Sequence, residues 1–252
     1  MASHDSVHLT AKDDGSTAVL PQTNTERARK RPDVASPDGP VCFRHAARTA
    51  PWPHGGTTSM SGLPAPLLTR DSAWTLLTEF TTSPVLIRHA VAVEAAMRGQ
   101  ATIYGGDIEY WGIVGLLHDF DFERYPTAEQ HPFEGARILR ERGHGEEFVE
   151  DILSHARYSG VARVRPVQKS LFAVDELSGF ITACALVKPS KSLSEIDPAG
   201  VRKKMRDKAF ARAVSRDDII DGAAELGVDL DAHVLVVVES LKPVAAELGL
   251  VA

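Results

Sequence analysis

From about residue 67 onward, apolar residues recur at the spacing of an α-helix, and strand-like alternation is almost absent. Proline and glycine interrupt these segments where helices typically begin and end. The pattern therefore predicts an all-α fold, a bundle of helices joined by short turns. The predicted helices run from Thr69 or Asp71 to Phe80, Ser83-Pro84 to Gly99, Gly106 to Asp119, His131-Pro132 to Arg142, Glu146 to Tyr158, Pro166 to Val187, and in three shorter pieces after Pro198, the last from Asp231 to Leu248.

The chain has 252 residues, 43% of them hydrophobic, which is enough for one substantial core. Residues 1–66 are rich in Ser, Thr, Pro, Gly, Asp and Arg and hold only isolated apolar residues, so we predict a disordered N-terminal extension. Met60 stands just before the ordered pattern and is a candidate native start. Residues 67–190 form the predicted main domain, and residues 191–252 a helical extension packed on it.

Charge and composition exclude several classes of protein. The net charge of -6 argues against a general nucleic-acid or membrane-surface binder. No apolar run is long enough to span a bilayer and the N-terminus lacks a signal-peptide core, so we expect a cytoplasmic location. The two cysteines, Cys42 and Cys184, lie in separate regions and indicate neither a disulfide framework nor a thiolate zinc site. Histidines and carboxylates must therefore hold any metal.

His118 and Asp119 close the apolar segment from Tyr110 to Leu117. An imidazole and a carboxylate at the end of a buried helix can ligate one ion, which makes an otherwise costly burial favourable. The carboxylate beside the histidine is the natural bridge between two ions. We therefore predict that Asp119 joins a dinuclear centre.

Two more candidate ligands lie within apolar helical segments. His89 has Leu86, Val93 and Met97 at helical spacing around it, so its side chain is expected to point inward or toward a pocket. Asp175 stands in the middle of an apolar helix, where a carboxylate needs a cation or strong donors.

Two histidines complete the predicted ligand set. His131 begins a predicted helix soon after the His-Asp pair, and His155 lies on or beside an apolar face. Helix bundles build dinuclear sites from ligands that project inward, and this mixture of groups suits iron, manganese, zinc or another first-row divalent ion. Glu176 follows Asp175 but faces another direction, so we expect it to be solvated or to support the ligands.

The order and helical placement of these residues resemble the HD superfamily of metal-dependent phosphohydrolases. Its H...HD...D pattern is matched by His89, His118-Asp119 and Asp175, and the resemblance covers residues 68 to 190. It implies that the main domain is an HD-domain helical bundle.

The extended pattern H...HD...H...H...D of dinuclear members is matched when His131 and His155 are added. Those members include HD-type diadenosine tetraphosphate hydrolases and HD-domain mixed-valent diiron oxygenases. The segment after Asp175 is similar to a group of uncharacterised predicted HD hydrolases. Phe120-Asp121-Phe122 replaces the Ile-Gly-Lys that often follows the His-Asp pair, and the Gly-Tyr-Pro signature of cyclic-di-GMP phosphodiesterases is missing. Cleavage of cyclic-di-GMP is therefore disfavoured.

The resemblance implies a hydrolase of a small phosphate ester or phosphoanhydride, with one or two divalent ions and with His118 and Asp119 as catalytic residues. Substrate charge then needs cations, for which we expect Arg124 and Arg157 first, then Lys188 and Lys191. The basic stripe from Arg202 to Lys208 is a further candidate. Two other functions stay open: an iron-dependent oxygenase, and a regulatory module that binds metal and nucleotide without turnover. The oligomeric state is also open.

Overall fold

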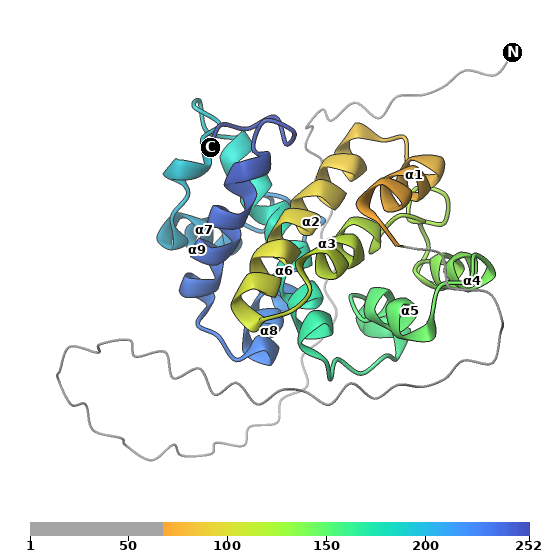
Figure 1. The fold of residues 1–252 in the computed structure, drawn as a ribbon. Helices are drawn as coiled ribbons and strands as arrows, with labels where there is room; N and C mark the ends of the chain where they lie inside the picture. The colour runs from red at the N-terminus through yellow and green to blue at the C-terminus, as the bar shows by residue number, and fades with distance from the viewer. Residues whose placement is uncertain (1–67) are drawn as a thin grey trace, which may run out of the picture. The chain divides into compact units, whose positions relative to one another are not determined.

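The computed structural model describes residues 68–252, and this part of the chain forms nine α-helices and no strand (Figure 1). One isolated bridge links Ser192 to Val251. The predicted all-α fold is confirmed for the described residues. The predictions for residues 1–66, including a native start at Met60, lie outside them.

The helices follow the order of the predicted segments. The first five are α1 (Arg70–Phe80), α2 (Pro84–Tyr104), α3 (Ile108–Leu117), α4 (Phe133–Glu141) and α5 (Glu146–Leu153). The remaining four are α6 (Pro166–Leu186), α7 (Pro198–Arg206), α8 (Arg216–Leu226) and α9 (Leu230–Leu241). Short 3-10 turns cover Arg157–Ser159, Leu193–Glu195 and Lys242–Val244.

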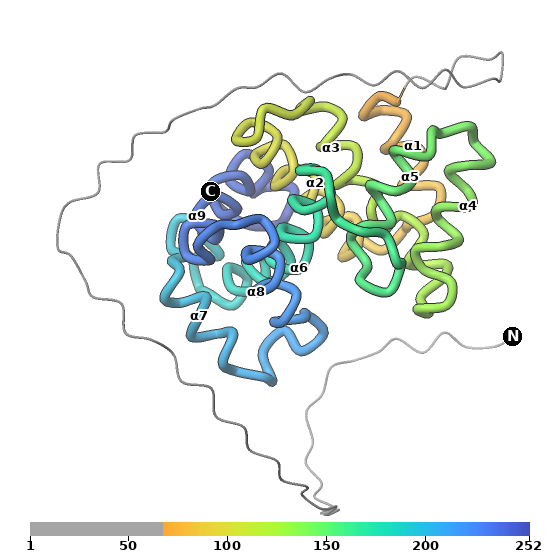
Figure 2. The backbone as a smooth tube through the Cα atoms, turned by 90° about the horizontal axis from the view of Figure 1, so that it is seen from below, coloured from red at the N-terminus to blue at the C-terminus, as the bar shows by residue number. Residues whose placement is uncertain are grey.

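Helices α2, α3 and α6 form the centre of the described bundle. α2 packs against α3, α6 and α9, and α6 packs against α8. Figures 1 and 2 both place α1, α4 and α5 on one side of this centre and α7, α8 and α9 on the other. One apolar cluster runs from Ala73 on α1 to Leu250 near the C-terminus. The helices after residue 190 thus share a core with those before it.

The prediction that a helix ends at Gly99 is wrong, because α2 continues to Tyr104 and ends at Gly105. Gly105 has a φ of 69°, the left-handed conformation that glycine adopts without strain. Gly99 instead permits close packing: a Cβ atom there would clash with the Ser240 hydroxyl oxygen on α9. This glycine marks a contact between helices and not a helix end.

The predicted helix from Glu146 to Tyr158 is also too long, because α5 ends at Leu153. Beyond it, the Ser154 hydroxyl donates to the Asp151 carbonyl, and the chain turns before the 3-10 segment. The last predicted helix similarly stops at Leu241, since Pro243 follows within two residues.

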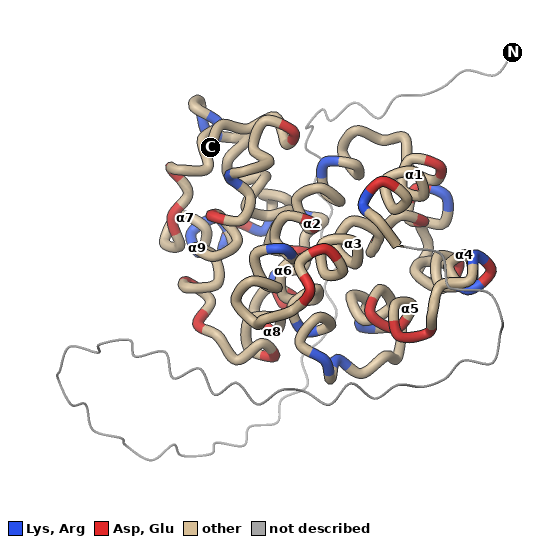
Figure 3. The backbone as a smooth tube through the Cα atoms, viewed as in Figure 1, with Lys and Arg blue, Asp and Glu red and all other residues tan. Residues whose placement is uncertain are grey.

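None of the helices in the described region combines the length and apolarity needed to cross a bilayer. Acidic and basic residues are interspersed along the described helices (Figure 3).

Candidate metal centre

The six predicted ligands come from five separate stretches of the chain. They are His89 on α2, His118 and Asp119 at the end of α3, His131 just before α4, His155 just after α5, and Asp175 on α6. The structure brings all of them together in two adjacent groups, each of which could hold a metal ion.

The first group consists of His89, His118 and Asp175, whose ligand atoms lie within 4.8 Å of one another. The Asp175 Oδ1 atom is 3.1 Å from Nε2 of His89 and 3.3 Å from Nε2 of His118. Two imidazoles and a carboxylate at such separations are a donor set that suits a first-row divalent ion.

The second group consists of Asp119, His131 and His155, which also lie within 4.8 Å of one another. Oδ1 of Asp119 is 3.1 Å from Nε2 of His131 and 3.2 Å from Nε2 of His155. The composition is again two imidazoles and one carboxylate.

Asp119 connects the two groups. While its Oδ1 atom faces the second group, its Oδ2 atom lies 3.3 Å from Nε2 of His118 and 3.9 Å from Nε2 of His89. A carboxylate that presents one oxygen to each of two ligand groups has the arrangement required of a bridge between two ions.

Hydrogen bonds at the other ring nitrogens fix the orientation of three histidines. Nδ1 of His118 lies 2.8 Å from the Gly115 carbonyl oxygen, and Nδ1 of His155 lies 2.7 Å from the Ile152 carbonyl oxygen. Nδ1 of His131 is 2.8 Å from a carboxylate oxygen of Asp121 (Oδ1). Because these oxygens can only accept, each Nδ1 carries the hydrogen and donates it. In the neutral rings Nε2 then has a free lone pair.

These lone pairs need a cation. Nε2 of His131 and Nε2 of His155 lie only 3.1 Å apart, and in neutral rings neither carries a hydrogen to donate to the other. Nε2 of His118 is buried and makes no hydrogen bond to any described residue. A metal ion, or protons, would satisfy these atoms, so the residues present fit a metal centre.

The acid–base properties of the cluster show how strongly its charges interact. Burial lowers the pKa of His118, but Asp119 and Asp175 outweigh it and hold the pKa well above its usual value. Burial also opposes protonation of His131, yet hydrogen bonds to Asp119 and Asp121 raise its pKa to about 9. Burial raises the pKa of Asp119, but the surrounding imidazoles dominate and keep it well below the usual range. The cluster thus strongly favours bound positive charge.

Sequence reasoning missed Asp121, which is 1% exposed. Its Oδ1 atom accepts from Nδ1 of His131, and its Oδ2 atom accepts from the backbone N–H of Gly135 at 2.8 Å. Gly135 permits this approach, since a Cβ atom there would lie 2.8 Å from Cγ of Asp121. The sequence did contain an indication of this role, because Asp121 stands between Phe120 and Phe122, and a carboxylate buried with such neighbours needs polar partners.

A cavity of about 480 Å³ opens beside both ligand groups. This volume suits a small molecule. Burial and the neighbouring Asp175 raise the pKa of Glu176 to about 7, and this side chain lines the cavity. The cavity is lined by His89, Asp119, Phe122, His131, His155, Ala156, Arg157, Tyr158, Phe172, Asp175, Glu176, Ala213, Val214 and Asp218.

Of the four predicted substrate-binding cations, the structure brings only Arg157 to this cavity. Arg124 turns toward α1, where it donates to the Glu79 carbonyl and lies 4.3 Å from the centre of the Phe80 ring. The loop position of Arg124 was predicted, but its direction depends on α1, which is distant in sequence.

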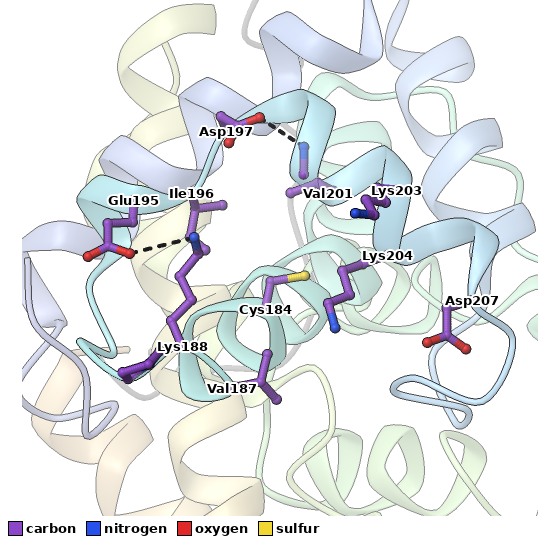
Figure 4. Close-up of a pocket in the computed structure, with 12 residues that line it drawn as sticks. Cys184, Val187, Lys188, Glu195, Ile196, Asp197, Val201, Lys203, Lys204 and Asp207 are labelled. Atoms are coloured by element: carbon purple, nitrogen blue, oxygen red, sulfur yellow. Dashed lines mark hydrogen bonds and ion pairs between the residues drawn. The ribbon is translucent and has the colours of Figure 1, made fainter.

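Lys188 and Lys191 follow the C-terminal end of α6, away from the metal centre. Lys188 lines a second pocket of about 420 Å³, shown in Figure 4, and pairs with Glu195 at 3.6 Å. Lys203 and Lys204 of the predicted basic stripe line the same second pocket. Arg202 of that stripe forms an ion pair with Asp231 at 2.5 Å.

No protein-family model matches this chain, and neither a curated protein nor a solved structure matches it.

Proposed function

We propose that this protein is a metal-dependent hydrolase of a small phosphate ester or phosphoanhydride, built as an HD-type domain with a dinuclear centre of iron, manganese or a related ion. The observation that carries the proposal is the position of Asp119, with one oxygen toward each of two groups that could hold a metal ion. The H...HD...H...H...D order of the six residues in the sequence supports it.

The proposed roles follow from the geometry. His89, His118 and Asp175 would hold one ion, His131 and His155 the other, and Asp119 both. Bound ions of this kind polarise a phosphoryl oxygen and lower the pKa of water, which supplies a nucleophile near neutral pH. Asp121 orients His131, and carbonyl oxygens orient His118 and His155, so these rings present Nε2 without rearrangement.

The cavity beside the ligand groups would receive the substrate. Its walls, Phe122, Tyr158 and Phe172 among them, supply apolar surface against which a substrate can pack. Arg157 is the one predicted phosphate-binding cation that lines it.

The test begins with the metal content of protein purified without chelators, measured by plasma mass spectrometry. Phosphate release from a panel of phosphomonoesters and nucleotides is then assayed with and without oxygen. We expect bound first-row metal and oxygen-independent phosphate release that is abolished in Asp119→Asn. The matched control is His144→Ala, because His144 lies at the turn before α5 and outside both ligand groups.

A requirement for oxygen would overturn the hydrolase proposal in favour of an oxygenase. Metal binding without turnover of any phosphate compound would favour a regulatory module. Metal-free protein that stays metal-free after incubation with iron or manganese would overturn the metal centre itself.

A further inference from the structure

The cavity beside the metal centre offers no free cation for a highly charged substrate. Arg157 is the only lysine or arginine among the described residues that line it. Its guanidinium already forms ion pairs with Asp218 and Asp221, the latter at 2.7 Å. The other charged residues in the lining, apart from the histidines, are carboxylates.

Glu176 is the unpaired carboxylate of this cavity. Its side chain is half-buried on α6. No lysine or arginine in the described region pairs with it. A half-buried carboxylate is stabilised by a cation that comes close to it.

An aromatic side chain lies on the same cavity. The Tyr158 side chain lines the cavity yet is 53% exposed, with the Phe133 ring centre 6.4 Å away. An exposed tyrosine ring attracts cations through its π face, and an ammonium group is a good partner for it. Carboxylate and aromatic surface together form the chemistry that recognises an amine.

We propose that the substrate carries a single phosphate group at one end and a positively charged ammonium group at the other, and that Glu176 binds the ammonium. The inference rests on the proposed hydrolase function and narrows its substrate class. The phosphate end belongs at the two ligand groups, and the ammonium end belongs at Glu176, beside Asp175 on α6. Nucleoside triphosphates, with several negative charges and no amine of this kind, fit poorly.

The first experiment compares two substrates of equal size on the metal-loaded protein. Phosphoethanolamine carries an ammonium where n-propyl phosphate carries a methyl group. We expect kcat/KM for phosphoethanolamine to exceed that for n-propyl phosphate by about tenfold or more, as a charge-assisted contact supplies. Glu176→Gln should bring that ratio close to one.

The matched control is Glu195→Gln, because Glu195 lines the second pocket and does not line this cavity. It should keep the wild-type ratio. Equal kcat/KM for the two substrates in the wild-type protein, or an unchanged ratio in Glu176→Gln, overturns the inference while leaving the hydrolase function intact.

A binding measurement separates this inference from the hydrolase proposal. 3-Aminopropylphosphonate matches phosphoethanolamine in shape, and butylphosphonate matches n-propyl phosphate. Neither phosphonate has an ester bond to hydrolyse, so calorimetry reports their affinity whatever reaction the protein performs. We expect tighter binding of the amine in the wild-type protein and no preference in Glu176→Gln. Tighter binding of the amine by a protein that releases no phosphate would overturn the hydrolase proposal and support amine recognition. Phosphate release by a protein that binds both phosphonates equally would support the hydrolase proposal and overturn amine recognition.

Discussion

Among single residues, Asp119 is the one whose loss should affect both ligand groups. Replacing it by alanine removes both oxygens, whereas His131→Ala or His155→Ala removes a ligand from one group only. We expect Asp119→Ala to bind the least metal, and each histidine variant to keep a single ion. Elemental analysis of the folded variants, with His144→Ala as control, measures this.

Full and equal metal content in Asp119→Ala, His131→Ala and His155→Ala would contradict a dinuclear centre. Circular dichroism must first show that each variant keeps the helical content of the wild-type protein.

Asp121 should control metal affinity without touching the ion. Asp121 uses one oxygen for His131 and the other for the Gly135 N–H, and asparagine has only one acceptor oxygen to replace both. We expect Asp121→Asn to weaken metal binding about 10- to 100-fold, the usual cost of losing a group that orients a ligand. Competition with a chromophoric chelator gives the affinity.

Gly135→Ala offers a second route to the same effect, because the added Cβ would displace Asp121 without changing any charge. Gly145→Ala is its control, since a Cβ at Gly145 meets nothing within 4 Å. If Gly135→Ala and Asp121→Asn both bind metal like the wild-type protein, Asp121 has no role in orienting His131.

At this scale the sequence predicts residues that stand out locally and misses those defined by distant partners. His118-Asp119 is visible because it ends an apolar run, and Asp175 because it interrupts one. The role of Asp121 depends on a chain segment that returns to it 14 residues later. The pairing of Arg157 is harder still to predict from the sequence, because its carboxylate partner Asp218 lies 61 residues away.

At the scale of helices, a buried polar contact joins α3, α5 and the start of α6. Asp151 on α5 is 0% exposed, accepts from the Tyr110 hydroxyl at 2.7 Å, and pairs with Arg165 at 2.5 Å. Burial raises the pKa of Asp151 to about 6, despite both partners. The carboxyl group of Asp151 therefore binds its proton more tightly in the folded protein than in the unfolded chain.

A pH dependence of stability follows from Asp151. A carboxyl with a raised folded-state pKa stabilises the fold fully below its unfolded pKa of about 4 and loses that contribution as pH rises through about 6. The contribution is at most about 3 kcal/mol. Asp151→Asn cannot titrate, so urea unfolding should show its free energy of unfolding rising relative to wild type from pH 4 to pH 7. Parallel pH profiles for the two proteins would contradict this.

Helix ends show the limit of sequence patterns at this scale. Most helix starts lie within two residues of a prediction, because Thr69, Pro84 and Pro166 act locally. The helix end predicted at Gly99 is wrong because the sequence does not distinguish a glycine that ends a helix from one that lets a neighbouring helix pack closely. Ser240, which lies against Gly99, cannot be anticipated without the packing of α9 on α2.

For the described region as a whole, the main structural question is whether the C-terminal helices unfold with the rest. α8 lies directly on α6, and a Cβ atom at Gly222 would come within 2.7 Å of Cα of Ala173. We expect Gly222→Ala to lower the free energy of unfolding by about 1–3 kcal/mol, because backbone atoms must move apart. Trp74 and Trp111 lie in the first half of this region and report its unfolding by fluorescence.

If the C-terminal helices share one cooperative core with the remainder, tryptophan fluorescence and circular dichroism should record the same lowered midpoint in Gly222→Ala. Two separate transitions, with the fluorescence midpoint unchanged, would instead show that residues 191–252 unfold independently.

The scattered origin of the ligands has a thermodynamic consequence. His89 and Asp175 are 86 residues apart in the chain, and an unfolded chain cannot hold them around one ion. An ion that binds only the folded form adds about 2.7 kcal/mol to the free energy of unfolding at a hundredfold excess over its Kd. The melting temperature should therefore rise with the concentration of free metal and fall when a chelator is added. In a cell, the lifetime of the protein would then follow the supply of that metal, because the ion-free chain opens to proteases more often.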